Sequence, residues 1–198
     1  MRLLSIDGNS KIVKTNKAAA GQYLFAGLSL MPDNITCPAA KAAGCMDVCL
    51  QSAGRGVFSN VRNARQGKTD WWHTDRDGFL DQLRKDLHAL ERKAAKLGVL
   101  PVVRLNVLSD IAWEDYGVPQ DFPAIRFYDY TKRQERLGRT PANYHLTFSY
   151  SAAPTYARQV ERALNREPAT NVAVVFSGGL PAKFLGRRVV DGDLHDIR

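Results

Sequence analysis

Apolar positions recur along the chain with two different periods, and the longer period predicts one long helix. In residues 75–98, apolar side chains return at steps of three and four, as in a helix with one buried face. Either Asp75 or Asp77 can cap its first turn, and Gly98 supplies the expected stop. The predicted buried stripe comprises Phe79, Leu83, Leu87, Leu90, Ala94 and Leu97.

Short apolar runs elsewhere predict interior strands. They cover residues 23–30, 102–107, 124–128, 145–148 and 172–176. Polar or helical connections separate them, including a predicted helix over residues 154–165. This alternation is typical of a parallel α/β sheet, which we expect to close into a partial or irregular (β/α) barrel. We expect residues 1–198 to form a single domain, with residues 1–20 as a peripheral N-terminal strand or hairpin.

Polar side chains follow several of these runs, where each strand should end. Because parallel strands gather their carboxyl ends on one face, we expect these groups to converge there. As catalytic candidates we take Asp110 and Glu114 for acid–base chemistry, and Lys132 for binding an anion or steering a proton. An equal alternative is that Asp110 and Glu114 only begin a helix. The candidate cofactor-binding residues at the same edge are Asn106, Ser109, Asp129 and Ser149.

All three cysteines, Cys37, Cys45 and Cys49, fall in one short segment, CPAAKAAGCMDVC. The segment directly follows the first predicted interior strand. A shared metal or cluster requires thiolate donors that a short loop can bring together, so we predict these residues as metal ligands. Zinc with a distant histidine such as His73 is the alternative metal site, and plain packing of small apolar thiols is the simplest alternative.

The net charge is +8, from 28 Lys plus Arg against 20 Asp plus Glu. Such a balance favours anionic partners, and nucleic acid is one candidate. The densest basic stretch predicts a phosphate-contacting set of Arg55, Arg62, Arg65 and Lys68. The chain begins without a basic-then-apolar leader and has no run of apolar residues long enough to span a bilayer. We therefore expect a cytoplasmic protein without membrane association.

The order of several segments resembles a known family. CPAAKAAGCMDVCLQSAGRG is followed by RLNVLSDIAWED, FPAIRFYDYTKR, NYHLTFS, NVAVVF and VVDGD. This succession looks like the phage-associated family described as gene product eighty-eight. The resemblance implies a viral or prophage origin, and hence the host cell cytoplasm, but no settled biochemical activity.

The cysteine segment is similar in style to the cluster loop of radical S-adenosylmethionine enzymes, although its spacing is wider. That likeness implies a [4Fe-4S] cluster held by Cys37, Cys45 and Cys49, with the fourth iron open to S-adenosylmethionine. It favours an iron–sulfur enzyme that acts on a small molecule or a nucleotide. The alternatives are a nucleic-acid-binding phage accessory protein with a structural zinc or iron–sulfur site, and a noncatalytic interaction protein. The sequence indicates no oligomeric state.

Overall fold

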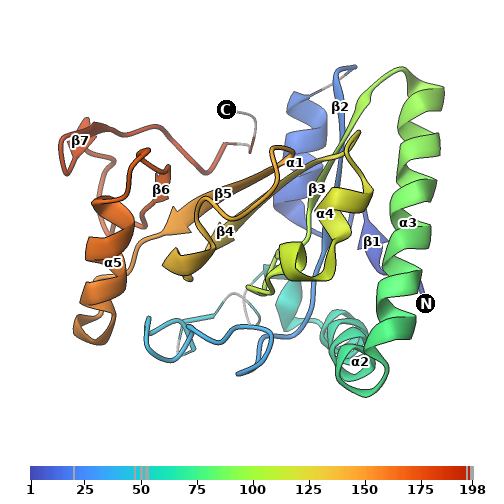
Figure 1. Ribbon diagram of the computed structural model, residues 1–198, viewed down its shortest axis with the longest axis horizontal. Coiled ribbons are helices and arrows are strands. Elements are labelled where there is room, and N and C mark those ends of the chain that lie inside the picture. Colours follow the sequence, from blue (N-terminus) through green and yellow to red (C-terminus); the bar gives the residue numbers. More distant parts are fainter. Residues whose placement is uncertain (20, 47, 50, 52–53, 195, 197–198) are drawn as a thin grey trace.

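A computed structural model describes residues 1–19, 21–46, 48–49, 51, 54–194 and 196. Their main feature is a six-stranded sheet in the order β1-β2-β3-β4-β5-β6 (Figure 1). The strands are β1 (Leu4–Ser5), β2 (Tyr23–Leu28), β3 (Leu100–Arg104), β4 (Arg126–Thr131), β5 (Tyr144–Ser149) and β6 (Val172–Ala173). All neighbours run parallel except β1, which lies antiparallel to β2. The predicted α/β class is confirmed, and the predicted parallel pairing holds for β2 to β6.

Strands β2 to β6 follow one another in space as they do in the chain. In the described part of the chain β1 and β6 do not pair, so no closed barrel is found. Strand β6 is shorter than predicted. Val175 lies beyond its last residue and is 98% exposed, because only Val172 and Ala173 pair with β5 at this edge.

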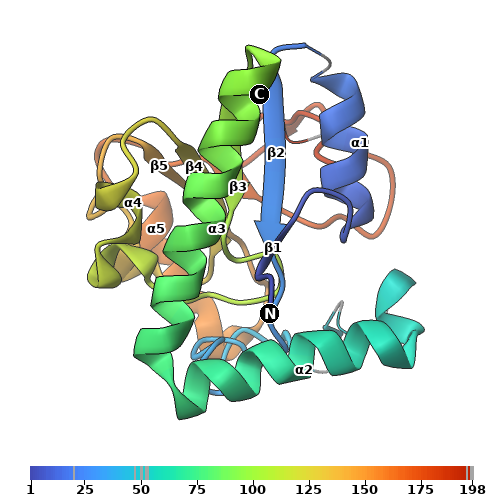
Figure 2. The ribbon, with the colours of Figure 1, turned by 90° about the vertical axis from the view of Figure 1, so that its right-hand side faces the viewer.

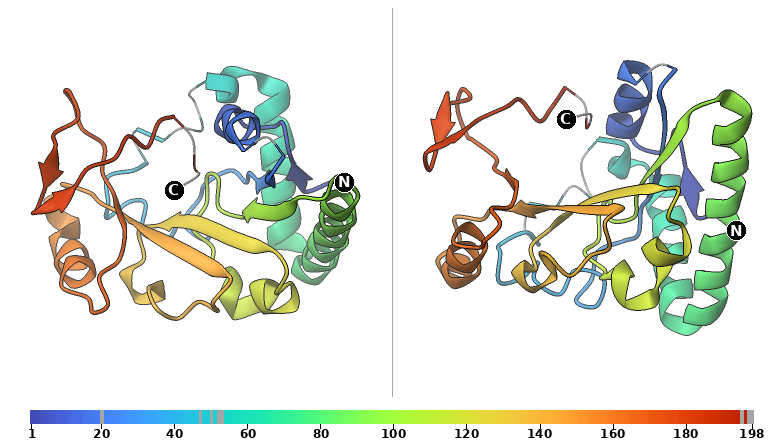
Figure 3. Two further views of the ribbon diagram at one scale, coloured as in Figure 1. Left: turned by 90° about the horizontal axis from the view of Figure 1, so that it is seen from above. Right: turned by 45° about the horizontal axis from the view of Figure 1, so that its top comes forward.

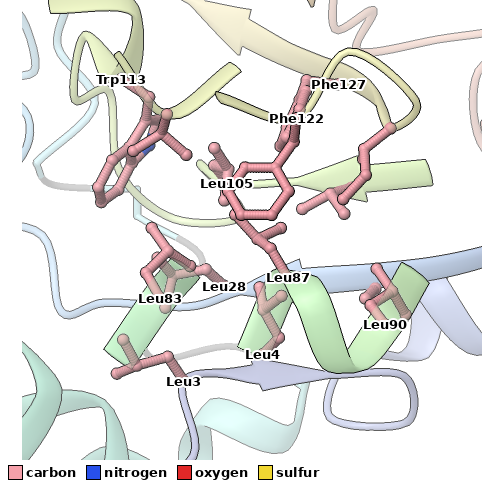
Figure 4. Close-up of a cluster of buried hydrophobic side chains, with 14 of the residues drawn as sticks. Leu3, Leu4, Leu28, Leu83, Leu87, Leu90, Leu105, Trp113, Phe122 and Phe127 are labelled. Atoms are coloured by element: carbon pink, nitrogen blue, oxygen red, sulfur yellow. The ribbon is translucent and has the colours of Figure 1, made fainter. Parts of the chain in front are cut away.

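The helix α3 (Arg76–Leu97) forms as the periodicity predicts. Asp75 accepts a hydrogen bond from the Gly78 amide, and Gly98 ends the helix in the left-handed conformation, with φ 67°. Leu97 is an exception to the predicted stripe, because it lies in the last turn and is exposed. The rest of the stripe packs on one face of the sheet, and Figure 4 shows part of this core, including Leu83, Leu87, Leu90, Leu28 and Leu105.

The helix α1 (Ser10–Ala18) covers the opposite face of the sheet, so that β2 lies between α1 and α3 (Figure 2). Ile12 packs there on Phe25 and Val102, whose neighbours in each strand point towards α3. This helix corrects the prediction of a strand or hairpin for residues 10–18, while β1 does lie at the sheet edge. The signal for the helix was the Asn9 side chain, which accepts hydrogen bonds from the Lys11 and Ile12 amides.

The helix α2 (Ser59–Thr74) lies beyond the carboxyl end of β2 (Figure 2). Its last turns include Trp72, which is buried against Phe79, Trp113 and Tyr116. The remaining short elements are η2 (Gly54–Val57), η3 (Trp113–Tyr116), α4 (Val118–Asp121), η4 (Gln134–Arg136), η5 (Pro154–Tyr156), α5 (Ala157–Leu164), β7 (Lys183–Phe184) and β8 (Arg187–Arg188).

The C-terminal hairpin of β7 and β8 lies at the end of the molecule opposite α3 (Figure 3). Residues 20, 47, 50, 52, 53, 195, 197 and 198 lie outside the described residues; four of them fall in the cysteine segment or directly after it. None of the helices in the described part of the chain combines the length and the apolar character that crossing a membrane requires.

Candidate functional site

The loop that follows β2 lies along the carboxyl edge of the sheet and is fastened to it at several points. The Asp110 amide donates to the Thr36 carbonyl at 2.6 Å, which ties the loop to the end of β3. Beyond β5, the Ser151 hydroxyl donates to the Ala43 carbonyl at 2.8 Å, and Thr155 donates to Ala42 at 2.6 Å. The fold therefore brings the cysteine loop to the edge where the predicted polar groups converge.

The three cysteines of this loop are all half-buried, and Cys45 and Cys49 lie close enough to Cys37 to act on it electrostatically. The Cys37 sulfur is 3.3 Å from the Leu108 carbonyl. Burial, and then the charges of Asp110, Cys49, Asp33 and Cys45, raise the pKa of the Cys37 thiol to about 12. In this arrangement Cys37 is a protonated thiol at neutral pH, so it must lose its proton to bind a metal.

Cys45 and Cys49 each lie near a cation. A Cys45 thiolate interacts favourably with the Lys132 ammonium, and a Cys49 thiolate with the Arg65 guanidinium. Cys45 also packs beside a small core that contains Phe148 and Tyr156, so its environment is partly apolar.

The thiols supply the donor chemistry of an iron–sulfur or zinc site, but they are not arranged as a finished ligand set. Among the described residues, no group of three His, Cys, Asp or Glu side chains is placed to hold a metal ion. His73, the histidine suggested for zinc, instead bonds to the Asp33 carboxylate at 2.7 Å. Ligation would therefore require the loop to draw its sulfur atoms closer together.

Asp110 and Glu114 are joined in a buried ion-pair network by Arg136, which the sequence reasoning missed. Arg136 is 1% exposed and binds both oxygens of Glu114 at 2.8 Å. It also binds Asp110 at 2.6 Å. Burial lowers the pKa of Arg136, but its hydrogen bonds to Glu114 and its attraction to these carboxylates raise it overall. Arg133 and Arg139 lie in the same basic stretch of sequence, so only the tertiary structure shows that Arg136 is the arginine that binds Asp110 and Glu114.

Asp129 and Asn106 form a second buried network beside the first. The Asp129 carboxylate accepts hydrogen bonds from the Tyr144 hydroxyl at 2.7 Å and the Asn106 amide at 2.8 Å. The Asn106 side-chain oxygen accepts from Ser109 at 2.8 Å and from Trp113 at 3.0 Å. Burial raises the pKa of Asp129 to about 6 against the lowering effect of these partners. The predicted cofactor-binding residues Asn106, Ser109 and Asp129 thus form hydrogen bonds with one another and with neighbouring residues, which stabilise the ends of β3 and β4.

Lys132 has a different environment from these buried groups. Its ammonium donates to the carbonyls of Ser149 and Tyr150 at 2.9 and 2.7 Å, and burial lowers its pKa. It lines a cavity of about 290 Å³ that also contacts Pro38 of the cysteine loop and Tyr156. Ser149, a predicted cofactor-binding residue, contacts Lys132 through its backbone carbonyl. Lys132 is therefore a predicted catalytic residue that lines a cavity beside the cysteine loop.

The four predicted phosphate-binding residues do not form one surface. Arg55, Arg65 and Lys68 line a separate cavity at the carboxyl end of β2. Arg62 is exposed on α2 and is not among the residues lining that cavity. The structure thus divides this set into three cations around a pocket and one on the open surface.

These features define an α/β protein with a mostly parallel six-stranded sheet and a cysteine-bearing loop on its carboxyl edge. The chain belongs to the family described as Gene product 88, whose model matches residues 2–198. No curated protein and no solved structure matches the chain significantly.

Proposed function

We propose that this protein binds an iron–sulfur cluster through Cys37, Cys45 and Cys49 and is an enzyme related to radical S-adenosylmethionine chemistry. The observation that supports the proposal is that all three thiols lie in one loop that hydrogen bonds fasten to the carboxyl edge of the sheet, with Cys45 and Cys49 near Cys37. Three thiolates leave one iron of a [4Fe-4S] cluster without a protein ligand, and S-adenosylmethionine is the ligand we propose for it.

The strand order supports a partial-barrel interpretation of the sheet. In doubly wound folds the strand order reverses at a switch point, whereas β2 to β6 follow a single direction, as barrel strands do. The cysteine loop directly follows β2, the first strand of the parallel run. Ligand sites in barrels are built by loops in this position. Both features agree with a cluster loop at the mouth of an incomplete barrel.

The cluster would supply the electron for the chemical step, and the chain's own residues would position the reactants. Lys132 is the candidate that touches a substrate, because it lines the cavity beside Pro38 of the cysteine loop. Its position suits binding of a carboxylate or phosphate of a small molecule or nucleotide. For Asp110 we propose a positioning role: its amide holds Thr36, one residue before Cys37, and its carboxylate is held by Arg136.

The test is anaerobic purification followed by iron and sulfide analysis and an absorption spectrum. Wild type should carry about four irons and about four sulfides per chain. Cys45→Ala should lose most of both, since alanine keeps the partly apolar packing but removes the ligand. Adding S-adenosylmethionine to the reduced cluster should change its electron paramagnetic resonance signal if one iron is open.

Val48→Ala is the matched control, because Val48 lies in the same loop and is 78% exposed. It should keep the wild-type iron content. Equal iron in Cys45→Ala and wild type would overturn the ligand assignment. One zinc per chain without sulfide would indicate a structural zinc site instead of a cluster. Absence of metal under all conditions would indicate that the cysteines only pack in the loop.

Nucleic-acid binding has less support as the main function. Arg65 is only 7% exposed, so it is poorly placed to contact the backbone of a polymer. Of the four predicted basic residues, Arg62 and Arg55 are the exposed ones.

A further inference from the structure

A cavity of about 270 Å³ lies at the carboxyl end of β2, between the start of α1 and one side of α2. Gly8 and Asn9 line it from the α1 end, and Gly27 from β2. A Cβ atom added at Gly27 would lie 2.9 Å from the Val107 side chain, so only glycine fits at this wall of the cavity without a shift. The cavity lies outside the cysteine loop and is separate from the one beside Lys132.

Three cations line this cavity: Arg55, Arg65 and Lys68. Among the described residues that line it, none is an aspartate or a glutamate. Asp86 attracts Lys68 from outside the cavity, but its carboxylate is occupied by the Leu3 and Leu4 amides and by Gln82. The lining therefore has an excess of positive charge that its own side chains do not neutralise.

Arg65 shows the strongest sign of a missing ligand. The residue is 7% exposed, and its Nη1 atom has no hydrogen-bond partner among the described residues. A buried donor without a partner is costly, so such groups in folded proteins usually meet a protein atom, a water or a ligand. The guanidinium rests against the backbone of η2: a Cβ added at Gly56 would lie 3.2 Å from Nη1.

The other two cations are held in place and still have donors to offer. The Lys68 ammonium donates to the Leu3 carbonyl at 2.9 Å, and the Arg55 Nη1 donates to the Asp7 carbonyl at 3.0 Å. An ammonium has three donors and a guanidinium five, so each retains donors for an anion. The positive end of the α1 dipole lies on the same side, at Asn9.

We propose that this cavity binds the phosphate group of a small ligand, through the guanidinium groups of Arg55 and Arg65 and the ammonium of Lys68. Arginine presents paired donors that match phosphate oxygens, and lysine adds a point charge. The burial of Arg65 favours a compact mono- or diphosphate over the backbone of a polymer. None of the three cysteines lines the cavity, and because a Cys49 thiolate attracts Arg65, it is Arg55→Gln that tests the site apart from the proposed cluster.

The test is calorimetric titration of the as-purified protein with inorganic pyrophosphate, alongside a single-stranded oligonucleotide. Wild type should bind pyrophosphate, and Arg65→Gln should weaken binding by about tenfold or more, because one charge-assisted hydrogen-bond partner is lost. Arg55→Gln should also weaken it, and because Arg55 is exposed this variant should fold normally.

Arg62→Gln is the matched control, since it removes the same charge from α2 outside the cavity; it should change the affinity less than about twofold. No binding of pyrophosphate by folded wild type would overturn the proposal, as would equal losses in Arg62→Gln and Arg55→Gln. Tight oligonucleotide binding that Arg62→Gln weakens most would instead assign these cations to a nucleic-acid surface.

Discussion

At the scale of single residues, the polar groups of the carboxyl edge divide into those that satisfy one another and those that face cavities. Arg136 joins Asp110 and Glu114, while Asp129 and Asn106 form the adjoining network. Lys132 and Arg65 instead line cavities. Local sequence does not distinguish these groups, because the hydrogen bonds that join Arg136 to Asp110, and Asp129 to Tyr144 and Asn106, link residues 15 or more positions apart along the chain.

Replacing Arg136 with methionine should lower the free energy of unfolding by about 3–5 kcal/mol, because two buried carboxylates lose their counter-charge. Urea denaturation measures the change. Arg139→Gln is the control: its contact with Asp115 is exposed, at 3.5 Å, and the change should stay within about 0.5 kcal/mol. A similarly small loss in Arg136→Met would show that the buried network adds little.

Asp129 should make stability depend on pH. Burial raises its pKa from 3.8 to about 6, so between these values the folded protein holds a proton that the unfolded chain has released. Its contribution to stability is complete below about pH 4 and is lost as the pH rises through about 6. The free energy of unfolding of wild type relative to Asp129→Asn should therefore fall over this range. Parallel pH curves for the two proteins would contradict this expectation.

At the scale of elements, the sequence predicts best where one face of a helix is apolar and its caps are explicit. The helix α3 satisfies both conditions. The helix α1 was missed, because its buried face is short and includes a polar residue, Thr15. Strand β6 was predicted too long, because an apolar run does not reveal how much of it finds a partner strand.

Leu87→Ala should cost about 2–5 kcal/mol of unfolding free energy, because Leu87 is fully buried between α3 and the sheet. Leu97→Ala makes the same change in the same helix at a residue that is 58% exposed, and should cost less than about 0.5 kcal/mol. Denaturation curves of the two variants give the comparison. Equal losses would mean that α3 does not pack on the sheet as described.

At the scale of the whole molecule, packing is uneven. The largest core lies between α3 and the strands β2 to β4, and a smaller one lies under α5. Residues 172–194 carry several exposed apolar side chains and are half-buried at most. Stability should therefore decrease from the α3 end of the sheet towards the C-terminal hairpin.

Hydrogen–deuterium exchange should reveal this gradient. Amides of β2, β3 and β4 should exchange slowest, and those of residues 172–194 much faster, because few buried contacts hold that segment. Mass spectrometry of peptic peptides measures both regions in one experiment. Comparable protection of residues 172–194 would indicate that another surface covers this segment in solution.

By itself, the sequence determined the α/β class, the long helix and its caps, the position of the inner strands and the family to which the chain belongs. These follow from local periodicity and from ordered motifs, which need no knowledge of distant partners. Only the tertiary structure decided which charges are neutralised and which face a cavity. Arg136 lies 26 residues from Asp110, and Lys68 lies 65 residues from Leu3. Contacts at such separations depend on how the chain closes in space, which no local pattern encodes.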